Sequence, residues 1–474
     1  MSSTVCINID DIRLPLYTGK SPIVSGNCYN SDKTFMSLCD DTARNAKMII
    51  VSNTDEHEFI NYIECLQNNG YGLISTEKIE NNEYATFTCG NGLLYAYYTA
   101  PKGTVNIIYD PVSALANDIS HVDSGENSAI EFYMYGLDMK CGVLPECGDA
   151  DAPHIGLLLI AKCSDNSLIL VDGGAPYHVK EERGERLNEF LHIITNTPAE
   201  EKVRISCWYL THTDGDHLWG FEEFIQRYQD KYDLKSICAN VPFEWLKISY
   251  PKEYDMAKAF SSWLCENYPN CKEIKIHTGQ HIKFAGITMR AIYTHEDRVD
   301  PISGKNDLIG RSLNHASTVI KIETDDMSMM VLGDALESCE TCILTSFSMK
   351  TLKSDIVQVS HHTFNGVSKN LYDQIAAPIH LAPVSYGWYC LRHYSSKLRA
   401  LYPDFEEIFK EKTVYFCGKP EYTVGFSSIY GKICVIRKPE TFPDFDINDK
   451  ETEKLAMRLL DTIGNGKYKD IPTS

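Results

Sequence analysis

The alternation of apolar and polar positions in the first part of the chain predicts a small antiparallel sheet packed on one helix. An apolar run at Lys47–Ser52 has the length and character of a strand. The segment Asp55–Gln67 has apolar residues at helical spacing, which predicts a helix with one buried face: Phe59, Ile60, Ile63 and Leu66. Strands separated by glycine- and proline-containing turns are expected at Tyr84–Cys89, Leu93–Thr99 and Thr104–Tyr109.

From about residue 129 the pattern changes to short apolar runs that alternate with helical stretches. Such runs are typical of strands covered by helices, which is a layered α/β arrangement. The polar stretch Asn117–Asn127 indicates a linker. We therefore expect a small α+β domain of undefined role over residues 1–128, an α/β domain over residues 129–440, and a C-terminal helix and tail over residues 441–474. The α/β strands are expected at Ile155–Ala161, Leu168–Val171, Val203–Leu210, Ile287–Ile292, Thr318–Ile322, Met329–Leu332, Asp355–Val359 and Ile379–Pro383.

The composition is that of a folded globular protein, because 43% of the 474 residues are hydrophobic and 23% are charged. Lys and Arg number 45 and Asp and Glu 65, so the net charge is −20, which disfavours binding to duplex nucleic acid. No window approaches the roughly 18 consecutive apolar residues of a membrane-spanning helix, and the N-terminus has no signal-peptide pattern. These features predict a cytoplasmic protein without a membrane partner, and they leave its oligomeric state open.

The 17 cysteines are scattered along the chain, and their odd number indicates free thiols rather than a disulfide framework. Cys339 and Cys342 have the spacing of a metal or redox pair. No second pair at a matching distance completes a four-cysteine site, so this spacing is weak evidence for chemistry.

The segment Val203–Gly220 concentrates metal-ligand side chains directly after an apolar strand. Within six positions it carries four of them: His212, Asp214, Asp216 and His217. Imidazoles combined with carboxylates match zinc, manganese or iron better than calcium. An amphipathic helix is expected next, at Leu218–Tyr228. The alternative is an ordinary helix start with Asp216 as its cap, but a cap explains one acid and not four donors.

Further donors follow two later strands of the same domain. Asp334 comes after Met329–Leu332, and His361 and His362 come after the run that ends at Val359. Open α/β sheets place their sites at the C-terminal ends of the strands. We therefore expect these side chains to meet the first group at one edge.

With these motifs in this order, the chain resembles the metallo-β-lactamase-fold hydrolases. That family has an acid-glycine turn, an H-x-H-x-D-H run, a strand-borne aspartate and a final histidine. The matching positions are Asp172-Gly173-Gly174, His212 to His217, Gly333-Asp334-Ala335 and Ser360-His361-His362. The resemblance covers roughly residues 129–438. It implies a four-layer αββα metallo-β-lactamase sandwich with the small α+β domain at its N-terminal side.

Within this family the chain is most similar to soluble relatives of the hydrolase domain of bacterial competence DNA-uptake proteins. That branch often has T-H-x-D-x-D-H, N-x-x-S, G-D and H-H in this order. In this chain Thr211–His217 matches the first motif and Asn314–Ser317 the second. Gly333-Asp334 and His361-His362 match the third and the fourth. Two departures matter: Thr363-Phe364 replaces the expected glycine and serine, and membrane spans are absent. DNA transport is therefore not implied.

The resemblance implies one or two divalent metal ions, with zinc favoured and manganese or iron allowed. One ion would be held by His212 and Asp214. The other would be held by Asp216, His217 and either His361 or His362, and Asp334 would bridge the two ions. His212, Asp216 and Asp334 would act in catalysis. Asp172 would orient a ligand histidine or hold its turn. His315 would either supply the missing imidazole or be an ordinary core or surface histidine.

An aromatic and cationic cluster follows the last core strand of the predicted domain. It comprises Tyr386, Trp388, Tyr389, Arg392 and His393. These side chains would line a substrate pocket, by stacking on a ring or clamping a phosphate, or they are ordinary core and surface aromatics.

The favoured function is hydrolysis by a metal-bound hydroxide, on a phosphoester or phosphodiester. Because the net charge is −20 and no basic tract is present, we expect a small phosphorylated or nucleotide-like substrate. The alternatives are a hydrolase of another ester or lactam class, a catalytically degenerate metal-binding scaffold or effector of the same fold, and a di-iron redox enzyme. The fold alone does not choose among them.

Overall fold

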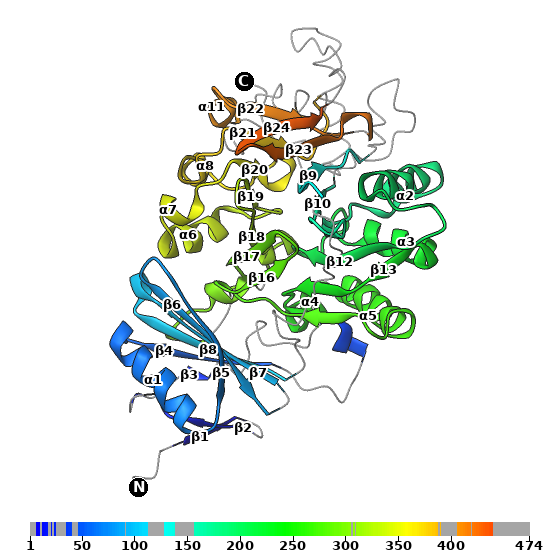
Figure 1. The fold of residues 1–474 in the computed structure, drawn as a ribbon. Coiled ribbons are helices and arrows are strands. Elements are labelled where there is room, and N and C mark those ends of the chain that lie inside the picture. Colours follow the sequence, from blue (N-terminus) through cyan, green and yellow to red (C-terminus); the bar gives the residue numbers. More distant parts are fainter. Residues whose placement is uncertain are drawn as a thin grey trace, which may run out of the picture.

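The computed structural model describes residues 6–9, 12–17, 20, 23–24, 35–39, 46–90, 92–111, 128–137, 156–304, 307–308, 310–386, 389, 405–418 and 420–438. Figure 1 shows the N-terminal sheet, in blue, below two further sheets that have helices on their outer sides. The most N-terminal elements form a separate antiparallel hairpin of β1 (Cys6–Ile9) and β2 (Ile12–Pro15).

The N-terminal sheet is antiparallel, with the strand order β3-β4-β8-β7-β6-β5. Helix α1 (Glu56–Asn68) covers one of its faces, and Asp55 caps this helix by accepting a hydrogen bond from the Glu58 amide at 2.9 Å. The predicted meander packed on a helix is confirmed. The strands are β3 (Ile23–Val24), β4 (Lys47–Ser52), β5 (Gly72–Ile79), β6 (Asn82–Cys89), β7 (Gly92–Thr99) and β8 (Thr104–Asp110).

The buried face of α1 differs in part from the prediction. Phe59 and Leu66 are buried as expected, whereas Ile60 is 41% exposed. Tyr62 takes its place in the core, and its hydroxyl donates a hydrogen bond to the Pro15 carbonyl at 3.2 Å. The expectation failed because a buried tyrosine with a partner for its hydroxyl serves as a core residue.

Two larger sheets form the rest of the described chain. The first has the order β15-β14-β12-β11-β10-β9-β23-β24, with β13 beside β12, and the second runs from β16 to β22 in sequence order. The predicted strands are all present, although the first begins three residues later than expected. The first sheet contains β9 (Glu131–Met134), β10 (Leu158–Lys162), β11 (Leu168–Asp172), β12 (Val203–Leu210), β13 (Tyr232–Leu234), β14 (Ser236–Ala239), β15 (Lys272–Ile274), β23 (Val424–Ile429) and β24 (Lys432–Arg437). The second contains β16 (His281–Phe284), β17 (Ile287–Tyr293), β18 (Val319–Glu323), β19 (Ser328–Val331), β20 (Ile356–Gln358), β21 (Ile379–Ala382) and β22 (Thr413–Phe416).

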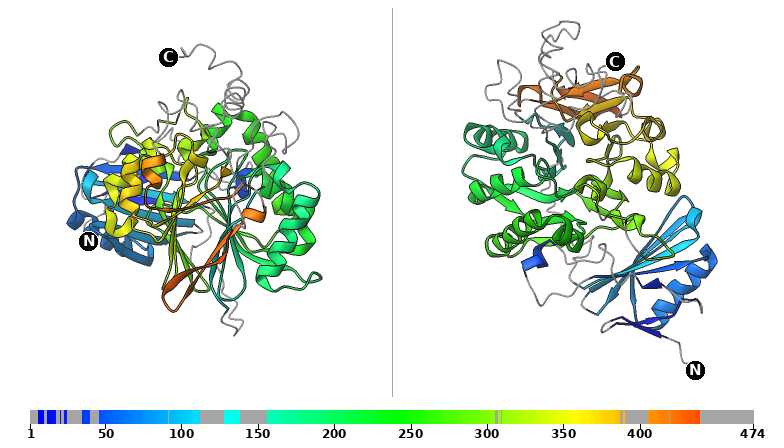
Figure 2. Two further views of the ribbon diagram at one scale, coloured as in Figure 1. Left: turned by 90° about the horizontal axis from the view of Figure 1, so that it is seen from above. Right: turned by 180° about the vertical axis from the view of Figure 1, so that it is seen from behind.

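Helices cover the outer faces of both large sheets (Figures 1 and 2). The first sheet carries α2 (Glu182–Thr195), α3 (Trp219–Arg227), α4 (Phe243–Ser249) and α5 (Pro251–Asn267). The second carries α6 (Glu337–Ser346), α7 (Met349–Leu352), α8 (Lys369–Ile375) and α11 (Phe405–Phe409). Short 3₁₀ turns complete the described elements: η1 (Met36–Cys39), η2 (Ala100–Lys102), η3 (Pro176–Val179), η4 (Gln229–Lys231), η5 (His295–Arg298), η6 (Leu313–Ala316), η7 (Ser360–Thr363) and η8 (Pro420–Tyr422).

The apolar side chains form one inner core and two outer cores. The inner core lies between the sheets, where Val171 and Tyr209 of the first sheet join Ile320 and Val331 of the second in one cluster. The outer cores lie between each sheet and its own helices. This layering confirms the predicted four-layer αββα sandwich.

Strands β4, β7 and β8 of the N-terminal sheet are buried on both faces. Because side chains alternate along a strand, Ile49 and Leu94 pack toward α1, whereas Ile50 and Tyr95 belong to a core of the sandwich. The predicted boundary at residue 128 stays a prediction. The linker at Asn117–Asn127 and the C-terminal helix and tail at 441–474 lie outside the described residues.

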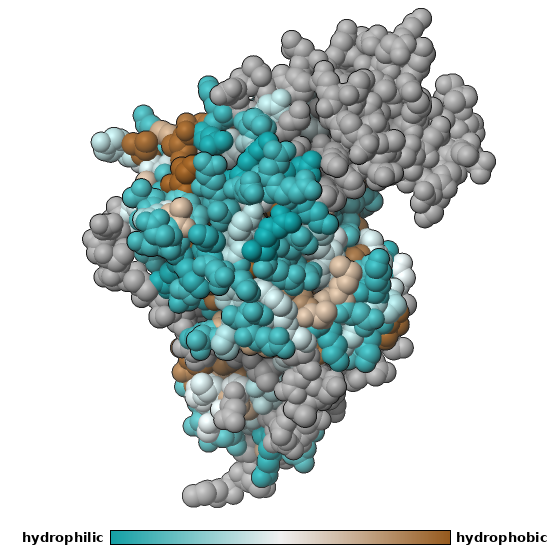
Figure 3. Space-filling view, turned by 90° about the vertical axis from the view of Figure 1, so that its right-hand side faces the viewer, coloured by the Kyte–Doolittle hydropathy of each residue, from teal (hydrophilic) through white to brown (hydrophobic). Residues whose placement is uncertain are grey.

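The outward side of α2 to α5 is mainly hydrophilic in the space-filling view (Figure 3). Among the helices of the described chain, none combines the length and apolar character that crossing a bilayer requires. No disulfide links cysteines within the described ranges.

A buried triad joins the N-terminal sheet to the sandwich. The His277 Nε2 atom lies 2.5 Å from Asp110 Oδ2 at the end of β8, and its Nδ1 atom lies 2.7 Å from Glu296 Oε2 in η5. Burial alone would lower the pKa of His277, but Glu296 and Asp110 outweigh this effect and raise it to about 9. The triad therefore holds an imidazolium between two carboxylates.

This triad predicts a stability that depends on pH. The folded-state pKa of His277, about 9, lies above its ordinary value of 6.5, so the stabilisation is complete below about pH 6.5 and is lost as the pH rises through 9. We expect the free energy of unfolding in urea to fall by up to about 3 kcal/mol across this window. The His277→Gln variant should be less stable and should lack this component. Equal pH slopes in the two proteins would contradict the assignment.

Candidate metal centre

Four strand ends meet at one edge of the sandwich and deliver the predicted side chains. In the first sheet, β11 and β12 are parallel; β11 ends at Asp172, and β12 leads into the segment that ends at His217. In the second sheet, β19 and β20 are also parallel and lead to Asp334 and His362. Parallel strands place their C-terminal ends together, and the described structure bears out the expected meeting of distant segments.

Glycines allow the turn after β11 to approach helix α3. A Cβ atom on Gly173 would lie 2.3 Å from the Phe221 Cβ atom, and one on Gly220 would lie 2.2 Å from the Gly173 carbonyl oxygen. Gly174 has a φ of +73°, and its carbonyl accepts a hydrogen bond from the Gly220 amide at 2.7 Å. The acid-glycine turn is thus packed directly against the start of the helix that follows the ligand segment.

Asp172 fixes two parts of the β12 segment. Its Oδ1 atom accepts from the Thr211 amide at 2.8 Å, and its Oδ2 atom lies 2.7 Å from the Thr211 hydroxyl and 2.7 Å from His217 Nδ1. Because a carboxylate only accepts, His217 carries its proton on Nδ1 and turns Nε2 toward the centre. Asp172 therefore orients a candidate ligand histidine, one of the two roles expected for it.

His362 is oriented in the same way from the other sheet. Its Nδ1 atom lies 3.0 Å from the Pro383 carbonyl oxygen, an obligate acceptor, so its Nε2 atom also faces inward. The Nε2 atoms of His217 and His362 lie 3.1 Å apart, although 145 positions separate these residues in the chain. Both side chains are fully buried.

Two carboxylates and a third imidazole complete the cluster. The Asp334 Oδ1 atom lies 3.2 Å from His217 Nε2 and 3.4 Å from His362 Nε2, and Asp216 Oδ2 lies 3.2 Å from His362 Nε2. The buried His212 Nε2 atom has no hydrogen-bond partner among the described residues. Ligand atoms lie within 4.8 Å of one another in two overlapping sets: His212, His217 and Asp334; and Asp216, His217 and His362.

The electrostatics of this cluster fit a cation. Two imidazole lone pairs and two carboxylates converge in a buried space, which is unfavourable unless positive charge lies between them. Burial would lower the pKa of His362, but Asp334 and Asp216 raise it to about 9, and the carboxylates likewise raise the pKa of His217. Three imidazoles with carboxylates suit zinc, manganese or iron, so the residues fit the metal expected from the sequence.

The structure separates the two adjacent histidines. His361 Nε2 lies 2.8 Å from the Asn314 side-chain amide and 3.8 Å from Asp334 Oδ2, at the rim of the cluster. His361, His362 and Thr363 have φ values of 49°, 51° and 63°. Left-handed backbone at non-glycine residues is strained, and such strain is typical of functional sites. This turn directs one histidine inward and leaves the other at the rim.

Two further candidates lie outside both ligand sets. Asp214 accepts a hydrogen bond from the Gly215 amide at 2.7 Å, and burial together with Asp216 raises its pKa to about 6. His315 Nδ1 lies 2.9 Å from the Ser338 hydroxyl and 3.4 Å from Arg298 Nη1, and its role stays a prediction.

The predicted substrate-binding cluster is described only in part. Tyr386 packs its ring against Phe416 with 5.2 Å between centroids, and Tyr389 packs against the same ring at 4.9 Å. The remaining members lie outside the described residues: Trp388, Arg392 and His393. The role of this cluster in substrate binding stays a prediction.

Sequence reasoning gave no role to Asn314, Thr211 or the Pro383 carbonyl. Asn314 and Thr211 stood within recognised motifs, so a signal for them existed, but their contacts depend on the turn geometry. The Pro383 carbonyl is a backbone group, and no sequence pattern marks it.

The sequence matches no protein-family model, and no curated protein matches it. Among solved structures, the fold is similar to a diphosphatase of the PhnP family, at 12% identity over 53% of this chain and 85% of that one, with a TM-score of 0.30. Zinc-bound PqqB from Methylobacterium extorquens matches at 11% identity over 48% of this chain and 72% of that one, with a TM-score of 0.29. Tm1679, a metal-dependent hydrolase of the β-lactamase superfamily, matches at 10% identity over 61% and 96%, with a TM-score of 0.31.

The geometry predicts different effects of removing the two adjacent histidines. After loading with zinc or manganese, His362→Ala should lose bound metal, whereas His361→Ala should retain it, because the inward Nε2 atom belongs to His362. Elemental analysis and thermal unfolding with and without chelator measure this. Metal at about 100 times its Kd should stabilise the wild-type protein by about 2.7 kcal/mol. Equal metal content in the two variants would contradict the assignment.

The contact between Asp172 and His217 predicts a second, subtler effect. Asp172→Asn keeps the shape of the side chain but weakens its hold on the His217 ring, so metal affinity should fall about 10- to 100-fold. Competition with a chelating dye measures the affinity, and circular dichroism checks the fold. Asp165→Asn, in the turn before β11, is the matched control and should bind metal normally. An unchanged affinity in Asp172→Asn would exclude its orienting role.

Proposed function

We propose that this chain is a metal-dependent hydrolase that acts on a small phosphoester or phosphodiester. One observation carries the proposal: three buried imidazoles and two carboxylates from three strand ends converge, with the Nε2 atoms of His217 and His362 only 3.1 Å apart. Perturbed ionisable groups that converge in this way are typical of functional sites.

A divalent ion held by these side chains supplies a Lewis acid and lowers the pKa of a water molecule toward 7, which provides a nucleophile at neutral pH. The chain's own residues do the positioning. His212, His217 and His362 would hold the ion or ions through Nε2, and Asp216 would hold them through its carboxylate. Asp334 lies against both ligand sets, which supports a role shared between two positions. No side-chain nucleophile is required.

The phosphoester assignment rests on the charge of the ligands and on the resemblance to the competence-protein branch. A carboxylate-rich ligand set prefers harder ions, which coordinate the oxygens of phosphate esters well. Zinc remains the favoured ion, and manganese or iron would suit the added carboxylates. The net charge of −20 favours a small substrate over a long nucleic acid.

Activity assays test the reaction class directly. Metal-loaded protein should hydrolyse a generic phosphodiester such as bis-p-nitrophenyl phosphate, or the corresponding monoester, and should lose this activity with chelator. Asp334→Asn should lower the rate at least about 100-fold, since it removes a candidate ligand. Asp326→Asn, an exposed aspartate in the turn before β19, is the matched control and should retain full activity.

Each alternative gives a different result. Activity confined to thioester and β-lactam substrates would overturn the phosphoester assignment but keep the hydrolase. Metal bound at full occupancy without any hydrolysis would favour the degenerate scaffold. Visible absorbance from bound iron, combined with redox activity, would favour the di-iron enzyme.

A further inference from the structure

The 3₁₀ turn η6 lies at the same edge of the sandwich as the candidate metal centre. The antiparallel register of β18 with β19 places the start of β18, shortly after η6, beside the end of β19 that leads to Asp334. The Thr318 amide donates a hydrogen bond to the Thr211 carbonyl at 2.9 Å, one residue before His212. The turn is therefore held beside strand ends of both sheets.

His315 lies in this turn but belongs to neither ligand set. The preceding residue, Asn314, reaches the rim of the metal centre, where its side-chain amide lies 2.8 Å from His361 Nε2. His315 is only partly buried, and both of its side-chain contacts with residues that the structure describes involve Nδ1. Its Nε2 atom is therefore available to a ligand beside the metal centre.

A relay of hydrogen bonds fixes the position of the proton on the His315 ring. Arg298 Nη1 donates to the Ser338 hydroxyl oxygen at 2.5 Å, and this hydroxyl lies 2.9 Å from His315 Nδ1. Arg298 Nη1 itself lies 3.4 Å from the same Nδ1 atom. Because a guanidinium only donates, the Ser338 proton is left to point at Nδ1, which accepts. The neutral ring therefore carries its own proton on Nε2 and presents an N–H donor there.

The charges around this donor are mainly positive. Burial, Arg298 and Arg311 lower the pKa of His315 to about 4, so its ring is neutral at neutral pH, and His361 contributes in the same direction. Arg298 pairs with one oxygen of Asp307 at 2.6 Å, and Arg311 lies 3.6 Å from the other oxygen. Among the described residues, two guanidinium groups thus share one carboxylate. A neutral N–H donor in such surroundings favours an anionic acceptor.

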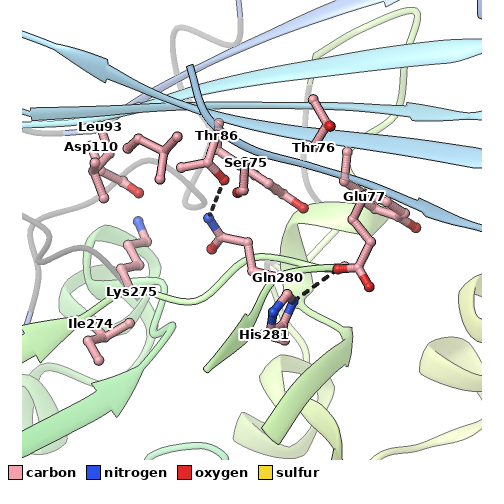
Figure 4. Close-up of a pocket in the computed structure, with 14 residues that line it drawn as sticks. Ser75, Thr76, Glu77, Thr86, Leu93, Asp110, Ile274, Lys275, Gln280 and His281 are labelled. Carbon is pink, nitrogen blue, oxygen red and sulfur yellow. Dashed lines mark hydrogen bonds and ion pairs between the residues drawn. The ribbon is translucent and has the colours of Figure 1, made fainter. Parts of the chain in front are cut away.

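The N-terminal sheet braces the turn that carries Arg298. In η5, the Asp297 carboxylate accepts a hydrogen bond from the Tyr97 hydroxyl of β7 at 3.0 Å. Figure 4 shows a further contact between this sheet and the sandwich, in which His281 pairs with Glu77 of β5 at 2.9 Å. Because Arg298 follows Asp297 directly, the contact with β7 helps to hold the guanidinium against His315 and Ser338.

From these contacts we infer that His315 is a substrate-positioning residue, whose Nε2–H group donates a hydrogen bond to a phosphoryl oxygen of the substrate at the rim of the metal centre. Arg298 and Ser338 fix the tautomer that makes this bond possible. The inference rests on the proposed phosphoester hydrolysis, and it gives His315 a role in binding the substrate rather than the metal.

Binding of inorganic phosphate tests this role on the metal-loaded full chain. By titration calorimetry after unbound metal has been removed, His315→Ala should bind phosphate at least about tenfold more weakly than the wild-type protein, because a hydrogen bond to a charged group is lost. His315→Gln should recover most of the affinity, since its side-chain amide nitrogen can donate from a position close to that of Nε2. Elemental analysis should find equal metal content in all three proteins.

The matched control is His57→Ala, which removes an exposed histidine of α1 and should bind phosphate as the wild-type protein does. Ser338→Ala tests the relay without changing the ring, and it should also weaken phosphate binding. NMR of protein labelled at the histidine ring nitrogens should show His315 protonated on Nε2, with resonances that are identified by their loss in His315→Gln. These resonances should shift when phosphate is added.

Several outcomes would overturn the inference: no phosphate binding by the wild-type protein, equal binding in His315→Ala, a ring protonated on Nδ1, or loss of metal in His315→Ala, which would make the residue a ligand. Kinetics with bis-p-nitrophenyl phosphate add a separate readout, in which His315→Ala should raise KM about tenfold and change kcat less. A wild-type protein that hydrolyses no phosphoester would refute the proposed function, and the phosphate titration would still decide whether His315 binds an anion.

Discussion

Two buried imidazole nitrogens that face each other beside two carboxylates are the constraint on which the functional edge of this protein depends. The Nδ1 atoms of His217 and His362 are already engaged by Asp172 and by the Pro383 carbonyl, so neither ring can turn to relieve the contact at 3.1 Å. The resulting concentration of lone pairs and negative charge is stable only with positive charge between them. The fold therefore contains a buried site that requires a cation.

The packing of the sandwich holds the side chains of this site in position. Each ring is held by a group from a neighbouring strand end, and the strand ends are fixed by the apolar core between the two sheets. The contact of Gly173 with Gly220 brings the turn that carries Asp172 against the start of α3, directly after His217. A larger residue at either glycine would separate the orienting carboxylate from its histidine. The metal centre and the close packing of the sheet edge are therefore one structural unit.

The strands, the layers and the region of the site could be predicted from the sequence because each donor follows an apolar run, and runs of this kind pack as parallel strands with their ends together. The individual ligands could not be assigned in the same way. Whether His361 or His362 points inward depends on three consecutive left-handed residues, which no propensity favours. Asp214 and His315 have suitable chemistry and lie near the cluster, but neither belongs to the two ligand sets, and their described contacts are with Gly215 and Ser338.

Buried histidines beside carboxylates have two different roles in this molecule. The roles differ in what the two nitrogens of each imidazole ring contact. His277 also lies buried between carboxylates, but both of its nitrogens donate, so one proton neutralises the contact and the triad becomes a structural link between the N-terminal sheet and the sandwich. At His217 and His362 one nitrogen of each ring contacts an orienting acceptor, and the two remaining Nε2 atoms face each other at 3.1 Å, where only one of them can donate to the other. Burial with matched donors fixes two parts of a chain together. Buried acceptors without enough donors, as at His217 and His362, require a bound ligand. This requirement distinguishes the candidate metal centre from His277, which has similar neighbours but a structural role.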